Sequence, residues 1–354
     1  MAAYWSNLAM VTSVVVYLLA LSAFAAEWAA ARRLEPERAL PAGVLVGSDG
    51  AVMGVEGPEG DVPSGAADDV TGPQRGASER VASGGGSAEG ASSEAGSSDA
   101  RDLKARLQVD LFGRMGLALI IIAWALHLTG VVCRGIAAQR FPWGNMYEFV
   151  TAALLFVVTI YLVLACRGMR WLGLPVSLLV VIGQGLAVTV LYVAVAPLVP
   201  ALHSVWFVIH IVAAAVAGAA FNVGGLLSIL YLMKIRAVRR EKVRGYLAKL
   251  PSPQRLDELA YKFHAFAFPL WTFAIAAGSV WAEYAWGRFW GWDPKETWSL
   301  VTWVVYAGYL HARATAGWRG KRAAIVAIVG LVCFWFNFVG INLLVSGLHS
   351  YAGI

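Results

Sequence analysis

Charge is scarce in this sequence. Only 14% of the 354 residues are Asp, Glu, Lys or Arg, and 59% are hydrophobic, whereas soluble globular domains average about a quarter and about half. This scarcity excludes an ordinary soluble protein and predicts an integral membrane protein. Because a chain crossing lipid must satisfy its backbone hydrogen bonds internally, and each apolar run can do so only as a helix, the predicted fold class is all-α.

Cysteine is also rare, and the three that occur lie far apart, at Cys133, Cys166 and Cys333. They form no CxxC pair, so the sequence does not indicate a thiol redox centre or a cysteine metal site. We expect them to be small packing residues of the membrane core. The net charge of +6 reports membrane topology and does not indicate a nucleic-acid partner.

The sequence is instead rich in long apolar runs. Eight of them are long enough, or nearly so, to cross roughly 30 Å of hydrocarbon at about 1.5 Å per helical residue. They cover about residues 8–30, 113–133, 147–166, 171–196, 204–233, 264–284, 297–312 and 323–345. The first run lacks a basic region before it and is followed by Arg32 and Arg33, which predicts a signal anchor with its N-terminus outside. We therefore predict a polytopic membrane protein with about eight transmembrane helices and both termini outside.

The basic residues are distributed as this topology requires. Of the 28 Lys and Arg residues, 24 fall in segments placed inside, and only Arg134, Arg140, Arg288 and Lys295 fall outside. Since an error of one span would invert every later loop, the asymmetry supports eight spans. The expected location is the cytoplasmic membrane, with the active site on the outer face.

Composition divides the chain into three parts. Residues 1–39 hold the anchor helix, and residues 101–354 hold the other seven helices. The segment between them, 40–100, is dominated by Gly, Ser, Ala and acidic residues and has no apolar cluster that could form a core. It is therefore predicted to be a disordered cytoplasmic insert.

Four tryptophans gather in one outer segment, WGRFWGWDPKETW, at residues 286–298, which we name the tryptophan segment. An interfacial aromatic belt explains one or two of them but not their alternation with glycines and charges. Tryptophan rings can stack on a planar ligand that glycines allow to approach, and Arg288 and Lys295 can meet anionic groups at its edge. Haem has this shape and carries carboxylates, whereas a quinone headgroup carries none.

The Asp-Pro-Lys-Glu run in this segment also has a structural interpretation. Asp293 fits the N-cap of the following helix, Pro294 its first position, and Glu296 completes a capping box. This role is compatible with ligand binding.

Histidine beside a membrane span is a functional candidate because its burial is costly, and imidazole is a common ligand of haem iron. His210, in the fifth span, and His349, beyond the eighth, are expected to converge outside and to supply two axial ligands. His203 also faces outward and ranks second as a ligand. His311 lies near the inner end of the seventh span, which suggests a second, inner haem position.

The remaining two histidines, His127 and His264, accompany no motif. We expect both to have structural or interfacial roles.

These features together resemble the CcsA (ResC) family of haem-handling WWD proteins, which serves system II cytochrome c biogenesis. Three stretches carry the resemblance: FPWGNMYEF at 141–149, HSVWFVIH at 203–210, and the region from FPLWTF to LHAR at 268–313. The WWD element alone also occurs in CcmC and CcmF of system I. The PKETW continuation, the Leu-His pair at 310–311 and the GLHSY motif at 347–351 are similar to CcsA in particular.

The resemblance implies roles for individual residues. His210 and His349 would ligate the iron of haem b at the outer face, and His311 would ligate an inner haem with help from a CcsB/ResB-type subunit. The porphyrin would rest on a platform made of Trp286, Gly287, Trp290, Trp292, Asp293 and Pro294.

The resemblance also implies a function and partners. The chain would be the membrane subunit of a holocytochrome c synthase (haem lyase), presenting haem to the CxxCH motif of apocytochromes c. Its partners would be the CcsB/ResB-type subunit, apocytochrome c and thiol-reducing cytochrome c maturation proteins. Two alternatives remain open, namely a haem exporter or carrier without ligase activity and a quinone-binding subunit of a membrane oxidoreductase.

Overall fold

The computed structural model describes residues 1–32, 44–46, 52–54, 88–345 and 347–349, and the regular secondary structure of this part is helical apart from one small hairpin. The longer helices are α1 (Ala2–Ala31), α2 (Ala88–Ala138), α3 (Met146–Cys166), α4 (Gly173–Thr189), α5 (Val205–Arg239), α7 (Pro253–Trp286), α8 (Pro294–Ala314) and α9 (Lys321–Trp335). The short elements are α6 (Tyr246–Lys249), α10 (Ile341–Leu344), the 3-10 turns Arg170–Leu172 and Pro200–Leu202, and a π-helix, η3 (Phe336–Gly340). The predicted all-α class is confirmed.

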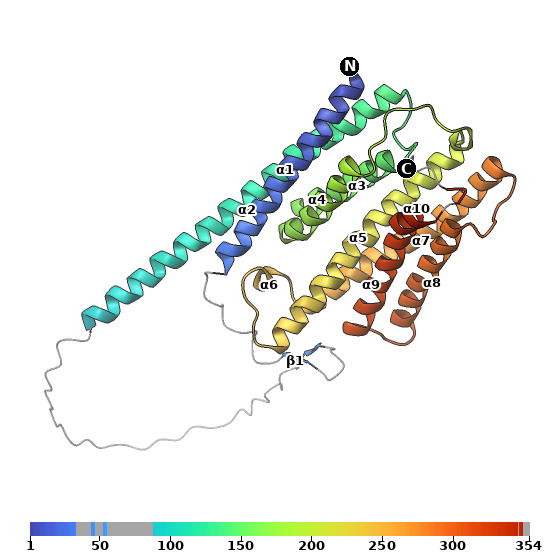
Figure 1. The fold of residues 1–354 in the computed structure, drawn as a ribbon. Helices are drawn as coiled ribbons and strands as arrows, with labels where there is room; N and C mark the ends of the chain where they lie inside the picture. The colour runs from blue at the N-terminus through green and yellow to red at the C-terminus, as the bar shows by residue number, and fades with distance from the viewer. Residues whose placement is uncertain (33–43, 47–51, 55–87, 346, 350–354) are drawn as a thin grey trace, which may run out of the picture.

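Seven helices in the described residues are long and apolar enough to cross a membrane, so the chain is a multi-pass membrane protein. They are Ala2–Ala31, Leu103–Ala138, Met146–Cys166, Arg170–Thr189, Val205–Arg239, Pro253–Trp286 and Lys321–Leu344. The predicted seventh span, α8, is helical over 21 residues but is more polar than these seven. It packs against α7 and α9 (Figure 1), and its crossing of the membrane remains a prediction.

The predicted fourth span differs most from the structure. Its helix ends at Thr189, whereas the apolar run continues to residue 196. The chain beyond it leaves the helix because two arginines bind its carbonyls: Arg134 donates to Val193 O over 2.6 Å, and Arg140 donates to Ala196 O over 3.3 Å.

The same two arginines both pair with Glu148, which is fully buried at the start of α3. Arg134 Nε donates to its Oε1 over 2.9 Å, and Arg140 Nη1 donates to its Oε2 over 2.7 Å. The backbone N–H of Gly144 donates to the same Oε2 over 2.8 Å. One carboxylate thus connects α2, the loop before α3 and the segment that leads to α5.

Part of the predicted insert is described. Strand β1 (Val44–Val46) pairs antiparallel with β2 (Val52–Gly54), and residues 88–100 belong to the first turns of α2. The other residues of 40–100 lie outside the described part, and disorder there remains a prediction.

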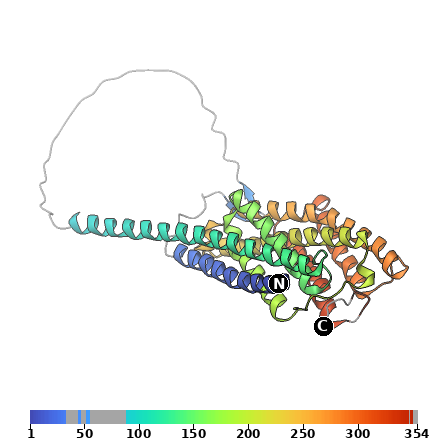
Figure 2. The same cartoon turned by 90° about the horizontal axis from the view of Figure 1, so that it is seen from above.

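The helices form a bundle in which α1 lies along α2 and α5 along α7 (Figures 1 and 2). The loops before α3, α5 and α8 meet at one end of the bundle, together with α10. We call this the tryptophan end, because it carries the tryptophan segment. The end where α8 stops and α9 begins is called the opposite end.

Candidate functional site

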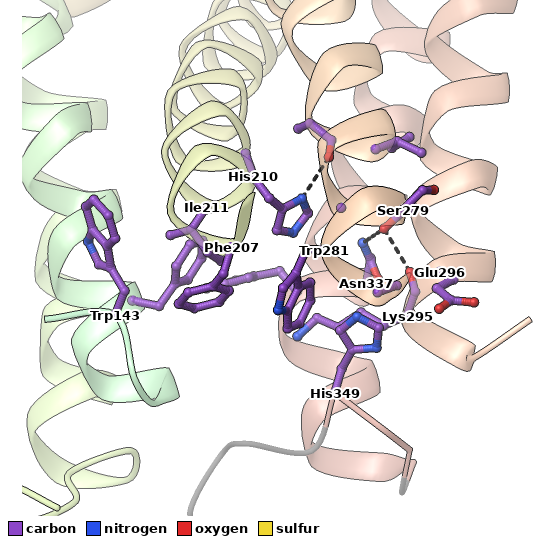
Figure 3. A pocket seen from close by; sticks show the side chains of 18 of the residues that line it. Trp143, Phe207, His210, Ile211, Ser279, Trp281, Lys295, Glu296, Asn337 and His349 are labelled. Atoms are coloured by element: carbon purple, nitrogen blue, oxygen red, sulfur yellow. Dashed lines mark hydrogen bonds between the residues drawn. The ribbon is translucent and has the colours of Figure 1, made fainter. Parts of the chain in front are cut away.

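A cavity opens at the tryptophan end, between α3, α5, α7, α8 and α9. Its walls are mostly apolar and aromatic, and a few polar side chains face it from α5, α8 and η3 (Figure 3). The polar and charged residues among those that line it include His210, Lys295, Glu296, Ser299, Asn337 and His349. A large apolar cavity with a few convergent polar groups is the usual form of a small-molecule site.

His210 projects from α5 with its ring fixed by α7 (Figure 3). Its Nδ1 lies 2.7 Å from the carbonyl oxygen of Ala274. Because a carbonyl can only accept, Nδ1 carries the hydrogen and Nε2 keeps the lone pair that a metal needs. The ring fits because residue 278 is glycine: a Cβ there would lie 2.7 Å from Nδ1 of His210.

His349 lies in a turn after α10 and is held by Asp293, its Nδ1 2.9 Å from Asp293 Oδ1. Asp293 also accepts the N–H groups of Leu348 and Lys295, over 2.8 and 3.0 Å. Burial raises the pKa of Asp293, but the hydrogen bond and charge of His349, with these N–H groups, lower it to about 2. The carboxylate therefore orients His349 through Nδ1 and leaves Nε2 free. The predicted capping box of Asp293 and Glu296 is present as well.

Both histidines contact one buried ring, that of Trp281. His210 stacks on it with a centroid distance of 5.8 Å, and His349 meets it edge-on at 5.5 Å. Trp281 is itself fixed by donating Nε1 to Ala201 O over 2.8 Å. The structure thus brings His210 and His349 to the same cavity.

The tryptophan segment contributes unequally to this cavity. Trp290 lines it, and Trp286 packs edge-on against His349 at 4.8 Å. Trp292 is 68% exposed with a φ of +58°, and its ring meets Trp290 at 90°. Gly287 ends α7 with a φ of +68°, and Pro294 begins α8. These residues do not form one flat platform, and much of the aromatic wall comes from elsewhere in the chain.

The two basic residues predicted to meet anionic groups are placed differently. Lys295 lines the cavity, and its Nζ donates to Asn342 Oδ1 over 2.8 Å. Arg288 pairs with Glu296 over 3.3 Å and is not among the lining residues. Lys295 is therefore better placed to bind an anionic group inside the cavity.

The other histidines lie away from the cavity. His203 is exposed beside the carbonyl of Leu198, at 3.3 Å, and His311 is exposed in the last turn of α8. His127 is buried 3.3 Å from the hydroxyl of Tyr17. His264 is buried among aromatic rings, with Tyr306 and Tyr309 both at 5.1 Å.

Several lining residues were not singled out from the sequence. They are Trp143 and Met146 before and in α3, Phe207 in α5, Trp271, Gly278 and Trp281 in α7, and Asn337 in η3. Some of these lie inside motifs that the sequence analysis quotes, such as FPWGNMYEF. No pattern within one motif distinguishes a wall of the cavity from ordinary helix packing.

Comparison with known proteins gives a consistent result. Residues 143–349 match the profile of a family described as "Cytochrome C assembly protein". The chain is 39% identical over 243 residues to the cytochrome c biogenesis protein CcsA of Guillardia theta, covering 62% of this chain and 79% of that protein. It is 35% identical over 299 residues to CcsA of Synechococcus sp. (strain JA-3-3Ab), covering 69% and 87%. The matched range begins at Trp143 and ends at His349, both of which line the cavity.

Proposed function

The chain belongs to the cytochrome c assembly protein family and to its CcsA group, and from this premise we propose that its cavity holds haem for attachment to apocytochromes c. The observation that carries the proposal is the pair His210 and His349. Each imidazole is oriented through Nδ1 by a hydrogen-bond acceptor, and each has a free Nε2 beside the same cavity. Two such nitrogens are suited to the two axial positions of haem iron.

The walls of the cavity support haem b as the substrate. The lining is mostly aromatic and apolar, as an apolar macrocycle requires. Lys295 offers one ammonium group for a carboxylate side chain. A quinone would use the aromatic walls but would leave two oriented imidazoles without a metal.

The proposed chemistry is thioether formation at the two vinyl groups of haem. Each cysteine thiol of a CxxCH motif adds across one vinyl double bond, so that a sulfur–carbon bond forms and the thiol hydrogen passes to the adjacent carbon. No electrons are gained or lost overall, and no protein nucleophile is needed. The protein contributes by orientation, which is worth about 7–11 kcal/mol when reactants are held in line.

The tryptophan end is proposed to face outward from the cytoplasmic membrane. In support, 24 of the 28 Lys and Arg residues lie in segments that this orientation places inside. His311 is then at the inner face, where its exposed imidazole is accessible to a CcsB/ResB-type subunit carrying a second iron ligand. Apocytochrome c and thiol-reducing maturation proteins are the other proposed partners.

The proposal is tested by co-expressing the full chain with a CcsB/ResB-type subunit and an apocytochrome that contains CxxCH. We expect the purified chain to show a haem spectrum and the apocytochrome to acquire covalently bound haem. Haem in the chain without covalent product would favour a haem carrier. A purified chain without haem, unable to bind added haem, would contradict the proposal.

A further inference from the structure

One polar atom in the wall of the cavity has no partner. Asn337 is 4% exposed and lines the cavity, and its Oδ1 is buried without a hydrogen bond among the described residues. Asn337 lies in the π-helix η3. Such π-helical turns occur often at functional sites, where they redirect side chains.

The orientation of the Asn337 amide follows from its neighbours. Ser299 Oγ donates its hydrogen to the carbonyl of Lys295 over 2.8 Å. It can therefore only accept from Asn337, whose Nδ2 lies 3.0 Å away. This assigns the NH2 group to Ser299 and leaves the oxygen as the free, acceptor side of the amide (Figure 3).

A buried acceptor without a donor is unfavourable, and the cavity is where a donor can arrive. Lys295 lines the same cavity one turn of α8 before Ser299. Its ammonium, held by Asn342 over 2.8 Å, places a positive charge in the same wall. The wall therefore offers a positive charge that can bind an anion. It also offers an oxygen that can accept a hydrogen bond from a group bound to that anion.

We infer that Lys295, Ser299 and Asn337 form a subsite for a carboxyl side chain of the occupant, and that Asn337 Oδ1 determines specificity for it. The Lys295 ammonium binds the carboxylate, and Asn337 Oδ1 accepts a hydrogen bond from a water that bridges it to the carboxylate. The inference rests on the proposed function, since haem carries two such carboxyl groups. It adds to that function by assigning the edge of the ligand that lies against α8 and η3, namely the edge that carries the carboxyl groups.

The test compares haem with its dimethyl ester, whose carboxyl groups can neither donate nor carry charge. Both are titrated optically into the purified full chain, its Asn337→Leu and Asn337→Asp variants, and Thr302→Val as a control. Thr302 is fully buried on α8 and does not line the cavity. Asn337→Asp is a nearly isosteric second variant that tests the site if Asn337→Leu folds poorly.

We expect Asn337→Leu to weaken haem binding about tenfold, the effect of losing one hydrogen bond of about 1.4 kcal/mol, and to leave the dimethyl ester nearly unaffected. Asn337→Asp should weaken haem binding further, because its charge repels a carboxylate, and should again spare the ester. Thr302→Val should change neither ligand.

Two results would overturn the inference. Equal weakening of haem and the ester in both variants would mean that Asn337 only shapes the cavity, and unchanged binding of both would mean that its oxygen is not used. In each case the wild-type chain still binds haem, so the proposed function survives. Failure of the wild-type chain to bind either ligand would instead overturn both proposals.

Discussion

Both ends of the bundle contain histidines that the sequence marks as functional, two at one end and one at the other, but the ends hold them differently. At the tryptophan end, His210 and His349 are fixed by hydrogen-bond acceptors and directed to a cavity. At the opposite end, His311 is exposed. The ordered contact there belongs to Arg313, which forms a bidentate pair with Asp257 over 2.8 and 3.0 Å and clamps α8 to α7.

This difference separates two oriented imidazoles from an exposed one. Acceptors behind an imidazole orient it before a metal arrives, so under the proposed function this chain alone orients both ligands at the tryptophan end. At the opposite end the Arg313–Asp257 pair joins α8 to α7, but His311 is exposed. Such an arrangement fits a site that a second subunit completes.

The strongest test of the comparison removes one histidine from each end. His210→Ala should abolish haem binding at the cavity, because an axial ligand is lost, and added imidazole should restore it. His311→Ala should leave this haem in place. The measurement is the optical spectrum of the purified variants with and without imidazole. Equal loss in both variants would mean that the two ends do not bind independently.

Gly278→Ala is expected to weaken haem binding strongly, although less than His210→Ala does. The added Cβ would lie 2.7 Å from Nδ1 of His210, so the ring must move from the carbonyl of Ala274. Loss of such an orienting contact typically lowers metal affinity about 10–100-fold.

Gly308→Ala in α8 is the matched control, because a Cβ there meets nothing within 4 Å. Haem titration of the two variants gives the comparison. Equal affinities would show that the position of His210 is not set by this glycine.

Asp293→Asn separates the charge behind His349 from the helix cap. Asparagine caps helices about as well as aspartate, so the fold should change little. The loss of the carboxylate that orients His349 should weaken haem binding about tenfold, near the lower bound for such contacts. Unchanged affinity would mean that the carboxylate charge is not needed.

The pH dependence of stability provides a second test of Asp293. Its folded pKa of about 2 lies below the unfolded value of about 3.9. The stabilisation is therefore complete above about pH 5 and is lost as pH falls through 4 to 2, up to about 2.6 kcal/mol. Unfolding of wild type and Asp293→Asn, measured by circular dichroism, should differ at neutral pH and converge near pH 2.

The smallest effect is expected at the opposite end. Arg313→Lys removes the bidentate geometry of the pair with Asp257 but keeps its charge, and should cost about 1 kcal/mol of stability. Haem affinity at the tryptophan end should not change. A loss of haem in this variant would show that the two ends are coupled through α8.

Much of the architecture could be predicted, because apolar runs that must form helices in lipid are visible in one sequence. The error after Thr189 arose because hydropathy does not show the arginines that bind the carbonyls of Val193 and Ala196. α8 was predicted to be a helix, although its polar residues make it less apolar than the seven candidate membrane-spanning helices.

The site was predictable in part. His210 and His349 could be paired because the predicted topology placed both at one end of the bundle. The capping role of Asp293 could be predicted because the capping pattern is local in sequence. Trp281 could not be found, since it is one of several tryptophans in α7 and only the packing of the structure shows that it contacts both histidines. The position of the Asn337 side chain depends on a π-helix, and no periodicity in the sequence predicts that helix.

The placement of His349 makes the two proposed iron ligands unequal. His210 is built into a long helix, whereas His349 lies in a turn after α10 and is tied to the bundle mainly through Asp293 and its own neighbour Leu348. We expect an incoming histidine of a CxxCH motif to displace the second and not the first. The turn that carries His349 would then move away from the iron, while α5 keeps His210 in position.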